Sequence, residues 1–149
     1  MRLTALLFCA ALLAGPALAQ ASTQAPALTP AEQTMARTVV AEHDRHIALL
    51  ERLVNQNSGT LNLPGVRAVA DMLTPEFEAL GLQVRWIDMA ETGRAGHLVA
   101  THAGPGRNVL LIGHLDTVFE ADSPFQTFVR DGDWAVGPGV GDDKGGVLV

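Results

Sequence analysis

Apolar side chains recur every three or four positions in two long stretches of the chain, a spacing that buries one face of a helix. The first stretch predicts a helix from residue 30 to about residue 55, with Thr29 as its N-cap. The second predicts a helix from about residue 64 to residue 80, closed by Gly81 in the left-handed conformation. The two apolar faces consist of Val39, Val40, Ile47, Leu50, Leu53 and Val54 in the first helix and Val66, Ala70, Leu73 and Phe77 in the second.

Shorter apolar runs predict strands in the second half of the chain. These strands are residues 82–87, 97–101 and 109–113, and a hairpin of residues 125–130 and 134–136. The run 109–113 is apolar without interruption, which is typical of a strand covered on both faces. Helices that precede strands, one of them buried, indicate a layered α/β fold.

The amino end carries a targeting pattern. A positive start is followed by the apolar run 3–13 and by small residues up to Ala19. The run is shorter than the ~20 apolar residues of a membrane anchor, which is the alternative. We therefore interpret residues 1–19 as a signal peptide and residues 20–28 as a flexible leader. The expected product is periplasmic or secreted, with no membrane span in the mature chain.

Composition narrows the class of protein. The chain has 149 residues, which favours one domain, and it is too apolar, at 48%, to be intrinsically disordered. Its net charge of −6 argues against nucleic acid as a partner. The single cysteine, Cys9, lies in the predicted signal peptide and excludes a disulfide framework.

A first candidate site lies in residues 113–118, which read GHLDTV. His114 follows the predicted strand, and sites in open α/β sheets form beyond the carboxyl ends of strands. Residues two apart in an extended segment point the same way, so His114 and Asp116 are expected to face one site. A neutral imidazole can bind zinc while a carboxylate accepts its other ring N–H. A structural His–Asp pair is the alternative for this segment taken alone.

A second candidate lies in residues 137–146, which read GPGVGDDKGG. The adjacent carboxylates of Asp142 and Asp143 repel each other unless a cation offsets their charge. A metal ion would do so, and Lys144 is expected to balance charge or to form hydrogen bonds in the loop. Glycines let the backbone approach such a ligand closely. The alternatives are a solvated turn and a phosphate loop, for which acidic side chains have the wrong sign.

Together the two segments resemble the paired signatures of the zinc aminoacylase and carboxypeptidase superfamily of metallopeptidases. These are a strand ending in H-x-D-[TV]-V and a later G-x-G-x-x-D-x-K-G-G. Within this superfamily, the sequence most resembles the glutamate carboxypeptidase branch. The features that carry this resemblance are the segment 57–60, the GHLDTVF form and the double-Asp loop. The resemblance implies a three-layer α/β/α catalytic domain, of which residues 29–149 would form the N-terminal part.

The resemblance also implies roles for individual residues. His114 would be a ligand of one zinc ion, Asp142 would bridge two zinc ions, and Asp116 would be the catalytic carboxylate behind His114. The peptide bond between Asp142 and Asp143 is often cis in such enzymes. Two zinc ions would activate a water for attack on a carbonyl, and a glutamate further along would be the general base.

The chain stops within a run, 145–149, that reads as the start of an apolar element, so the sequence is interpreted as truncated. The general base, a further carboxylate ligand and a late histidine ligand are expected beyond Val149. A catalytic zinc usually has three protein ligands, whereas this chain supplies two metal-binding residues. The polypeptide as written is therefore expected to be inactive and to bind zinc weakly.

The predicted function is that of an exported zinc-dependent exopeptidase or amidohydrolase. It would hydrolyse a C-terminal amide bond and release glutamate or a similar amino acid. The expected substrate is a small peptide or an N-acyl amino acid, and the full-length protein could form a homodimer. The alternatives are an aminoacylase or dipeptidase of the same superfamily and a non-catalytic secreted remnant of the fold.

Overall fold

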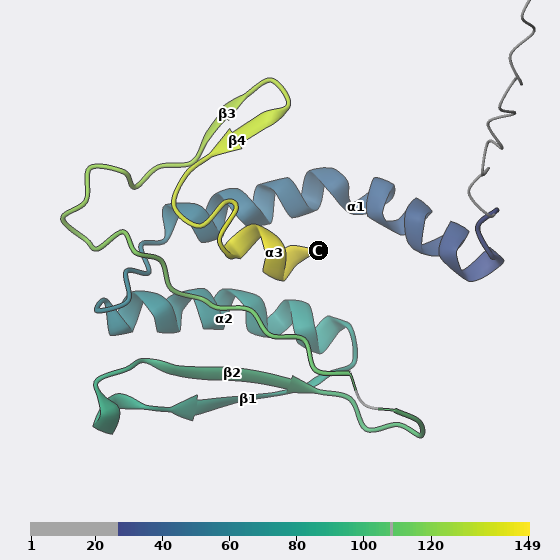
Figure 1. The fold of residues 1–149 in the computed structure, drawn as a ribbon, viewed down its shortest axis with the longest axis horizontal. Coiled ribbons are helices and arrows are strands. Elements are labelled where there is room, and N and C mark those ends of the chain that lie inside the picture. The colour runs from purple at the N-terminus through teal and green to yellow at the C-terminus, as the bar shows by residue number, and fades with distance from the viewer. Residues whose placement is uncertain (1–26, 108) are drawn as a thin grey trace, which may run out of the picture.

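The computed structural model describes residues 27–107 and 109–149 (Figure 1). The predicted signal peptide and all of the leader up to residue 26 lie outside the described residues. The elements are α1 (Pro30–Asn55), α2 (Leu63–Ala79), β1 (Gln83–Asp88), a short 3₁₀ helix (Ala90–Thr92), β2 (Gly96–Thr101), β3 (Val129–Asp131), β4 (Trp134–Val136) and α3 (Lys144–Leu148).

Both long helices are confirmed, but the predicted buried face of the first is wrong at Val39 and Val40, which are 64% and 77% exposed. α1 begins in a capping box, in which the Thr29 hydroxyl accepts from the Glu32 amide at 3.3 Å and the Glu32 carboxylate accepts from the Thr29 amide at 2.7 Å. α2 runs through Pro75 as one helix, and Gly81 follows it with φ of 78°. No helix in the described part of the chain is long and apolar enough to cross a membrane.

The strands form two separate antiparallel hairpins. β1 pairs with β2 from Gln83–Thr101 to Asp88–Gly96, close to the predicted strands. β3 pairs with β4 across a two-residue turn in which Gly132 has φ of 58°, a value that favours glycine. The first strand of this second hairpin is three residues long, shorter than the predicted 125–130.

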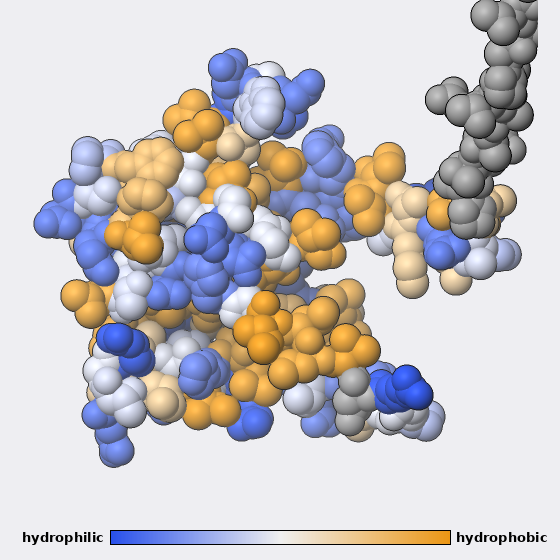
Figure 2. Space-filling model, viewed as in Figure 1, coloured by the Kyte–Doolittle hydropathy of each residue, from blue (hydrophilic) through white to orange (hydrophobic). Residues whose placement is uncertain are grey.

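The predicted buried strand at residues 109–113 is wrong. These residues form no strand, and the side chains from Val109 to Ile112 are 81–88% exposed. A strand needs a neighbour to pair its backbone, and the described residues offer this run none. The run instead crosses α2 as an extended segment (Figure 1), and apolar side chains gather in that part of the surface (Figure 2).

The described residues therefore combine helices with two two-stranded sheets. This agrees with the prediction of a chain that mixes α and β elements. The three-layer α/β/α arrangement needs a sheet covered by helices on both faces, and the part of the chain described here does not contain one. The three-layer domain stays a prediction.

The core lies between the two long helices, which run side by side (Figure 1). Its fully buried centre consists of Leu49 and Leu53 from α1 and Val69 and Leu73 from α2. Around it pack Met72, Phe77, Leu98, Leu115, Val147 and Leu148. The core thus joins β2, the GHLDTV segment and α3 to the helix pair.

Replacing Leu53 by alanine should lower the free energy of unfolding by about 2–5 kcal/mol, because this fully buried side chain would leave a cavity. Urea unfolding measures the change. Leu61→Ala is the control, because Leu61 is 69% exposed, and it should change stability by no more than about 0.5 kcal/mol. Equal effects of the two substitutions would contradict this core.

Candidate metal centre

The GHLDTV segment presents alternate side chains to opposite sides. Leu115 packs against the core, whereas His114 and Asp116 point away from it toward each other. The predicted convergence of these two residues is therefore confirmed, although the segment is extended coil rather than the end of a strand. The period of two along an extended backbone suffices to put both on one side.

The glycine-rich loop brings the acidic pair to this segment. It follows β4 and leads into α3, whose Val147 packs against the core. A Cβ on Gly113 would lie 2.7 Å from Asp143 Oδ2, so the glycine leaves room for that carboxylate. The peptide bond between Asp142 and Asp143 is cis, the conformation that the resemblance implies.

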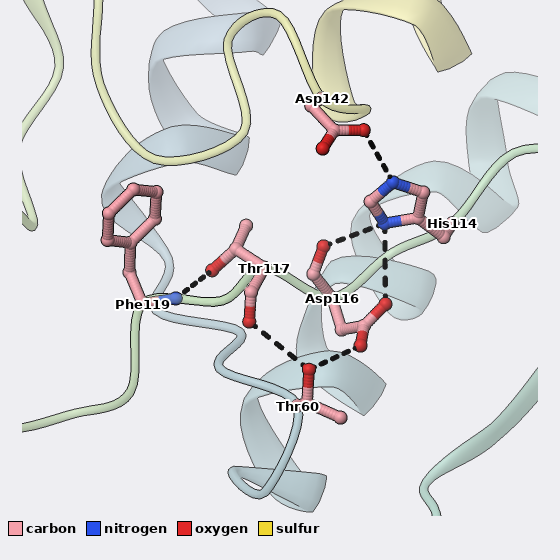
Figure 3. Close-up of polar contacts among 6 residues, drawn as sticks. All are labelled: Thr60, His114, Asp116, Thr117, Phe119 and Asp142. Atoms are coloured by element: carbon pink, nitrogen blue, oxygen red, sulfur yellow. Dashed lines mark hydrogen bonds and ion pairs between the residues drawn. The ribbon is translucent and has the colours of Figure 1, made fainter.

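Asp142 and Asp116 lie on either side of the His114 ring (Figure 3). The Nε2 atom of His114 is 2.9 Å from Asp142 Oδ1. The Nδ1 atom is 2.9 Å from the Asp116 carbonyl oxygen and 3.3 Å from Asp116 Oδ1. The three predicted site residues therefore form one cluster, in which the histidine connects two carboxylates.

The charges of this cluster favour a protonated imidazole. The hydrogen bond to Asp142 raises the pKa of His114 most, and burial opposes it. The hydrogen bond to the Asp116 carbonyl and the negative charges of Asp142 and Asp116 raise the pKa further. The side chains of His114 and Asp142 are 45% and 90% exposed, so solvent reaches both partners of this hydrogen bond.

Thr60 also belongs to the cluster, although its sequence context predicts no role for it there. Its hydroxyl donates to Asp116 Oδ2 at 2.6 Å. Thr60 reaches this position because its loop pairs with the GHLDTV segment: its amide donates to the Thr117 carbonyl, and the Thr117 amide donates to the Ser58 carbonyl.

Lys144 is buried, and its ammonium group faces the end of α1. The Nζ atom donates to the carbonyls of Leu53 at 2.7 Å and Gln56 at 2.9 Å. These acceptors lie where a helix leaves its last carbonyls without partners and carries partial negative charge. Burial lowers the pKa of Lys144 to about 8. The lysine thus has a hydrogen-bonding role, one of the two roles predicted for it, with acceptors at the end of α1.

The geometry matches part of a metal site. Zinc binds imidazole nitrogen and carboxylate oxygen at about 2.0–2.2 Å, and tetrahedral angles then separate two donors by about 3.3 Å. His114 Nε2 and Asp142 Oδ1 are 2.9 Å apart, so a slight opening of the pair would admit the ion. Within residues 27–107 and 109–149, no group of three His, Cys, Asp or Glu side chains is arranged to hold a metal. The described residues therefore fit zinc as a partial set of donors.

An imidazole and a carboxylate that converge, with a second carboxylate behind the ring, are typical of hydrolytic metal centres. No family model matches the chain. Over 144 residues, 93% of the chain, the sequence is 34% identical to Carboxypeptidase G2 of Pseudomonas sp. (strain RS-16). The chain spans 32% of the length of that protein. This similarity confirms the resemblance to the glutamate carboxypeptidase branch, over a part of such a protein.

Replacing Lys144 by methionine should lower the free energy of unfolding by about 1–3 kcal/mol, because methionine fills similar space but leaves the carbonyls of Leu53 and Gln56 without this donor. Denaturant unfolding measures the loss. Arg94→Met is the control, because Arg94 is exposed, and it should stay within about 0.5 kcal/mol of the parent protein. Unchanged stability of Lys144→Met would refute the role of this contact.

Proposed function

We propose that the protein is an exported zinc-dependent hydrolase of the carboxypeptidase kind. It would cleave a C-terminal amide bond and release glutamate or a similar amino acid from a small peptide or an N-acyl amino acid. The observation that carries this proposal is the pair formed by His114 Nε2 and Asp142 Oδ1, with Asp116 behind the ring. Its occurrence in a chain 34% identical to Carboxypeptidase G2 supports the reaction class.

His114 and Asp142 would hold the metal. A histidine ligand must present a lone pair at the metal-facing nitrogen, so the proton now favoured at Nε2 would leave when the ion binds. The Nδ1–H group then keeps its hydrogen bond to the Asp116 carbonyl, which fixes the tautomer and the ring plane. Asp142 would contribute its carboxylate and, as the resemblance implies, bridge two zinc ions.

Asp116 would act as the supporting catalytic carboxylate. Its charge lies 3.3 Å from the Nδ1 atom of His114 and makes the imidazole a stronger donor. Zinc, when bound, supplies a Lewis acid that lowers the pKa of water and polarises the scissile carbonyl. The general base and the groups that grip the substrate carboxylate would come from other parts of the full protein, in a three-layer α/β/α domain to which residues 29–149 would contribute.

The experiment compares two reactions of the protein expressed from its whole gene. One is release of glutamate from a peptide or folate-type conjugate, and the other is deacylation of N-acyl amino acids. We expect glutamate release that a zinc chelator stops and added zinc restores. A preference for deacylation would assign the protein to the aminoacylase alternative, and no hydrolysis with zinc present would favour the non-catalytic remnant.

In that protein, His114→Ala and Asp142→Ala should each abolish zinc-dependent hydrolysis, because each removes a metal ligand. Asp116→Ala should lower activity or zinc affinity by about 10–100-fold, because it removes only the group that supports the ligand. His102→Ala and Asp133→Ala are matched controls on the exposed surface and should keep full activity. Hydrolysis retained by either ligand variant would refute the assigned site.

We also propose export, on the strength of the charged start, the short apolar run and the small residues before the predicted cleavage after Ala19. Export should remove residues 1–19, so the mature protein should begin at Gln20. Amino-terminal sequencing of the periplasmic or secreted product tests this. A product that is found outside the cytoplasm and still begins at Met1 would contradict cleavage and favour an anchor.

A further inference from the structure

We propose that Thr60 is the positioning residue for Asp116. The strength of His114 as a metal ligand then depends on a hydroxyl from the loop between α1 and α2. This inference rests on the proposed function, because it assigns the support of the same metal centre. In the described part of the chain, the Thr60 hydroxyl makes no hydrogen bond to His114 or Asp142, and it bonds the carboxylate of Asp116.

The Asp116 carboxylate is held on both of its oxygens. Oδ2 accepts the Thr60 hydroxyl at 2.6 Å, and Oδ1 lies 3.3 Å from His114 Nδ1 (Figure 3). A hydrogen bond to an ionised carboxylate is short and about twice as strong as one between neutral groups. A carboxylate without this bond could turn about its terminal torsion, which is broad and soft. The hydroxyl therefore fixes the oxygen that faces the imidazole.

The backbone of Thr60 is held firmly enough to act as a fixed support. Its amide donates to the Thr117 carbonyl at 3.0 Å, and the next amide, of Leu61, donates to Glu120 Oε1 at 3.1 Å. Gly59 makes this approach possible, because a Cβ there would lie 2.7 Å from the Glu120 Cα atom. The loop is thus docked on the segment that carries Asp116.

Thr60 can support Asp116 only if its hydroxyl proton points toward the Asp116 carboxylate. Thr60 Oγ1 also lies 3.3 Å from the Thr117 carbonyl oxygen, and a hydroxyl has one proton to donate. The 2.6 Å contact to an ionised oxygen is the shorter and the charge-assisted one, so the proton points to Asp116. A proton on the Thr117 side would leave two oxygen lone pairs facing each other at that distance.

The test compares Thr60→Val, which keeps the shape and removes the hydroxyl, with Thr60→Ser, which keeps the hydroxyl. Thr74→Val is the matched control, because Thr74 is also part-buried and its hydroxyl bonds only the Ala70 carbonyl within α2. Three quantities are measured in the protein expressed from its whole gene: zinc affinity by competition with a chelator, kcat and KM separately, and the NMR signal of the Asp116 side-chain carboxyl carbon without metal. Thr60→Ala replaces the valine variant if that one does not fold.

We expect Thr60→Val to weaken zinc binding or kcat by about 10–100-fold with little change in KM, and to move the Asp116 signal. The serine variant should recover zinc affinity and kcat to within about threefold of the parent protein, and Thr74→Val should match the parent. A valine variant equal to the parent, or a serine variant as impaired as the valine variant, would overturn the inference.

Failure of the proposed function gives a different result. If the parent protein binds no zinc and hydrolyses nothing, the proposed function is wrong. The Asp116 signal still tests the contact in that case: a shift in Thr60→Val that Thr60→Ser reverses supports the positioning of the carboxylate. If the Asp116 signal does not shift in Thr60→Val, the positioning of the carboxylate by Thr60 is also overturned.

Discussion

The contact between the Lys144 ammonium group and the last carbonyls of α1 determines where the candidate site forms. Two carbonyls at the carboxyl end of that helix, those of Leu53 and Gln56, receive their hydrogen bonds from this side chain. The lysine immediately follows the two acidic residues of the glycine-rich loop, so the contact also fixes the loop that carries Asp142. Burying an ammonium group is costly unless it is hydrogen-bonded, and these two acceptors meet that condition.

The remaining parts of the site depend on the same core. Leu53 lies in the buried cluster, and its carbonyl accepts a hydrogen bond from Lys144. One residue of α1 therefore connects the hydrophobic core to the glycine-rich loop. Leu115 packs against that cluster and sets His114 and Asp116 on its other side. The loop after α1 then adds the Thr60 hydroxyl to the Asp116 carboxylate. A small hydrophobic centre thereby aligns three separate segments around one imidazole.

The sequence predicted those features that depend on local physics. The capping box at Thr29, the two helices and the glycine turn of the second hairpin each depend on interactions within a few residues, and each is confirmed. Val39 and Val40, predicted to lie on the buried face of α1, are exposed. The prediction of a buried strand at residues 109–113 is wrong, because an apolar run becomes a buried strand only beside strands that pair with it.

The residues of the candidate site were predictable from local sequence patterns, but its long-range contacts were not. The two motifs gave His114, Asp116 and Asp142, and alternation along an extended backbone correctly placed the first two together. The bond from Thr60 to Asp116 joins residues 56 positions apart, and that of Lys144 to Leu53 joins residues 91 apart. Local patterns carry no information on such contacts, which follow from how the helices, loop and hairpins pack.

The central claim is that His114 and Asp142 are donors to one metal ion. Anomalous diffraction at the zinc edge, from crystals of the protein grown with zinc, tests it most directly. The account predicts an anomalous peak in contact with both His114 Nε2 and the Asp142 carboxylate, with Nδ1 still turned toward Asp116. Zinc bound elsewhere, with the His114–Asp142 hydrogen bond intact, would contradict the account.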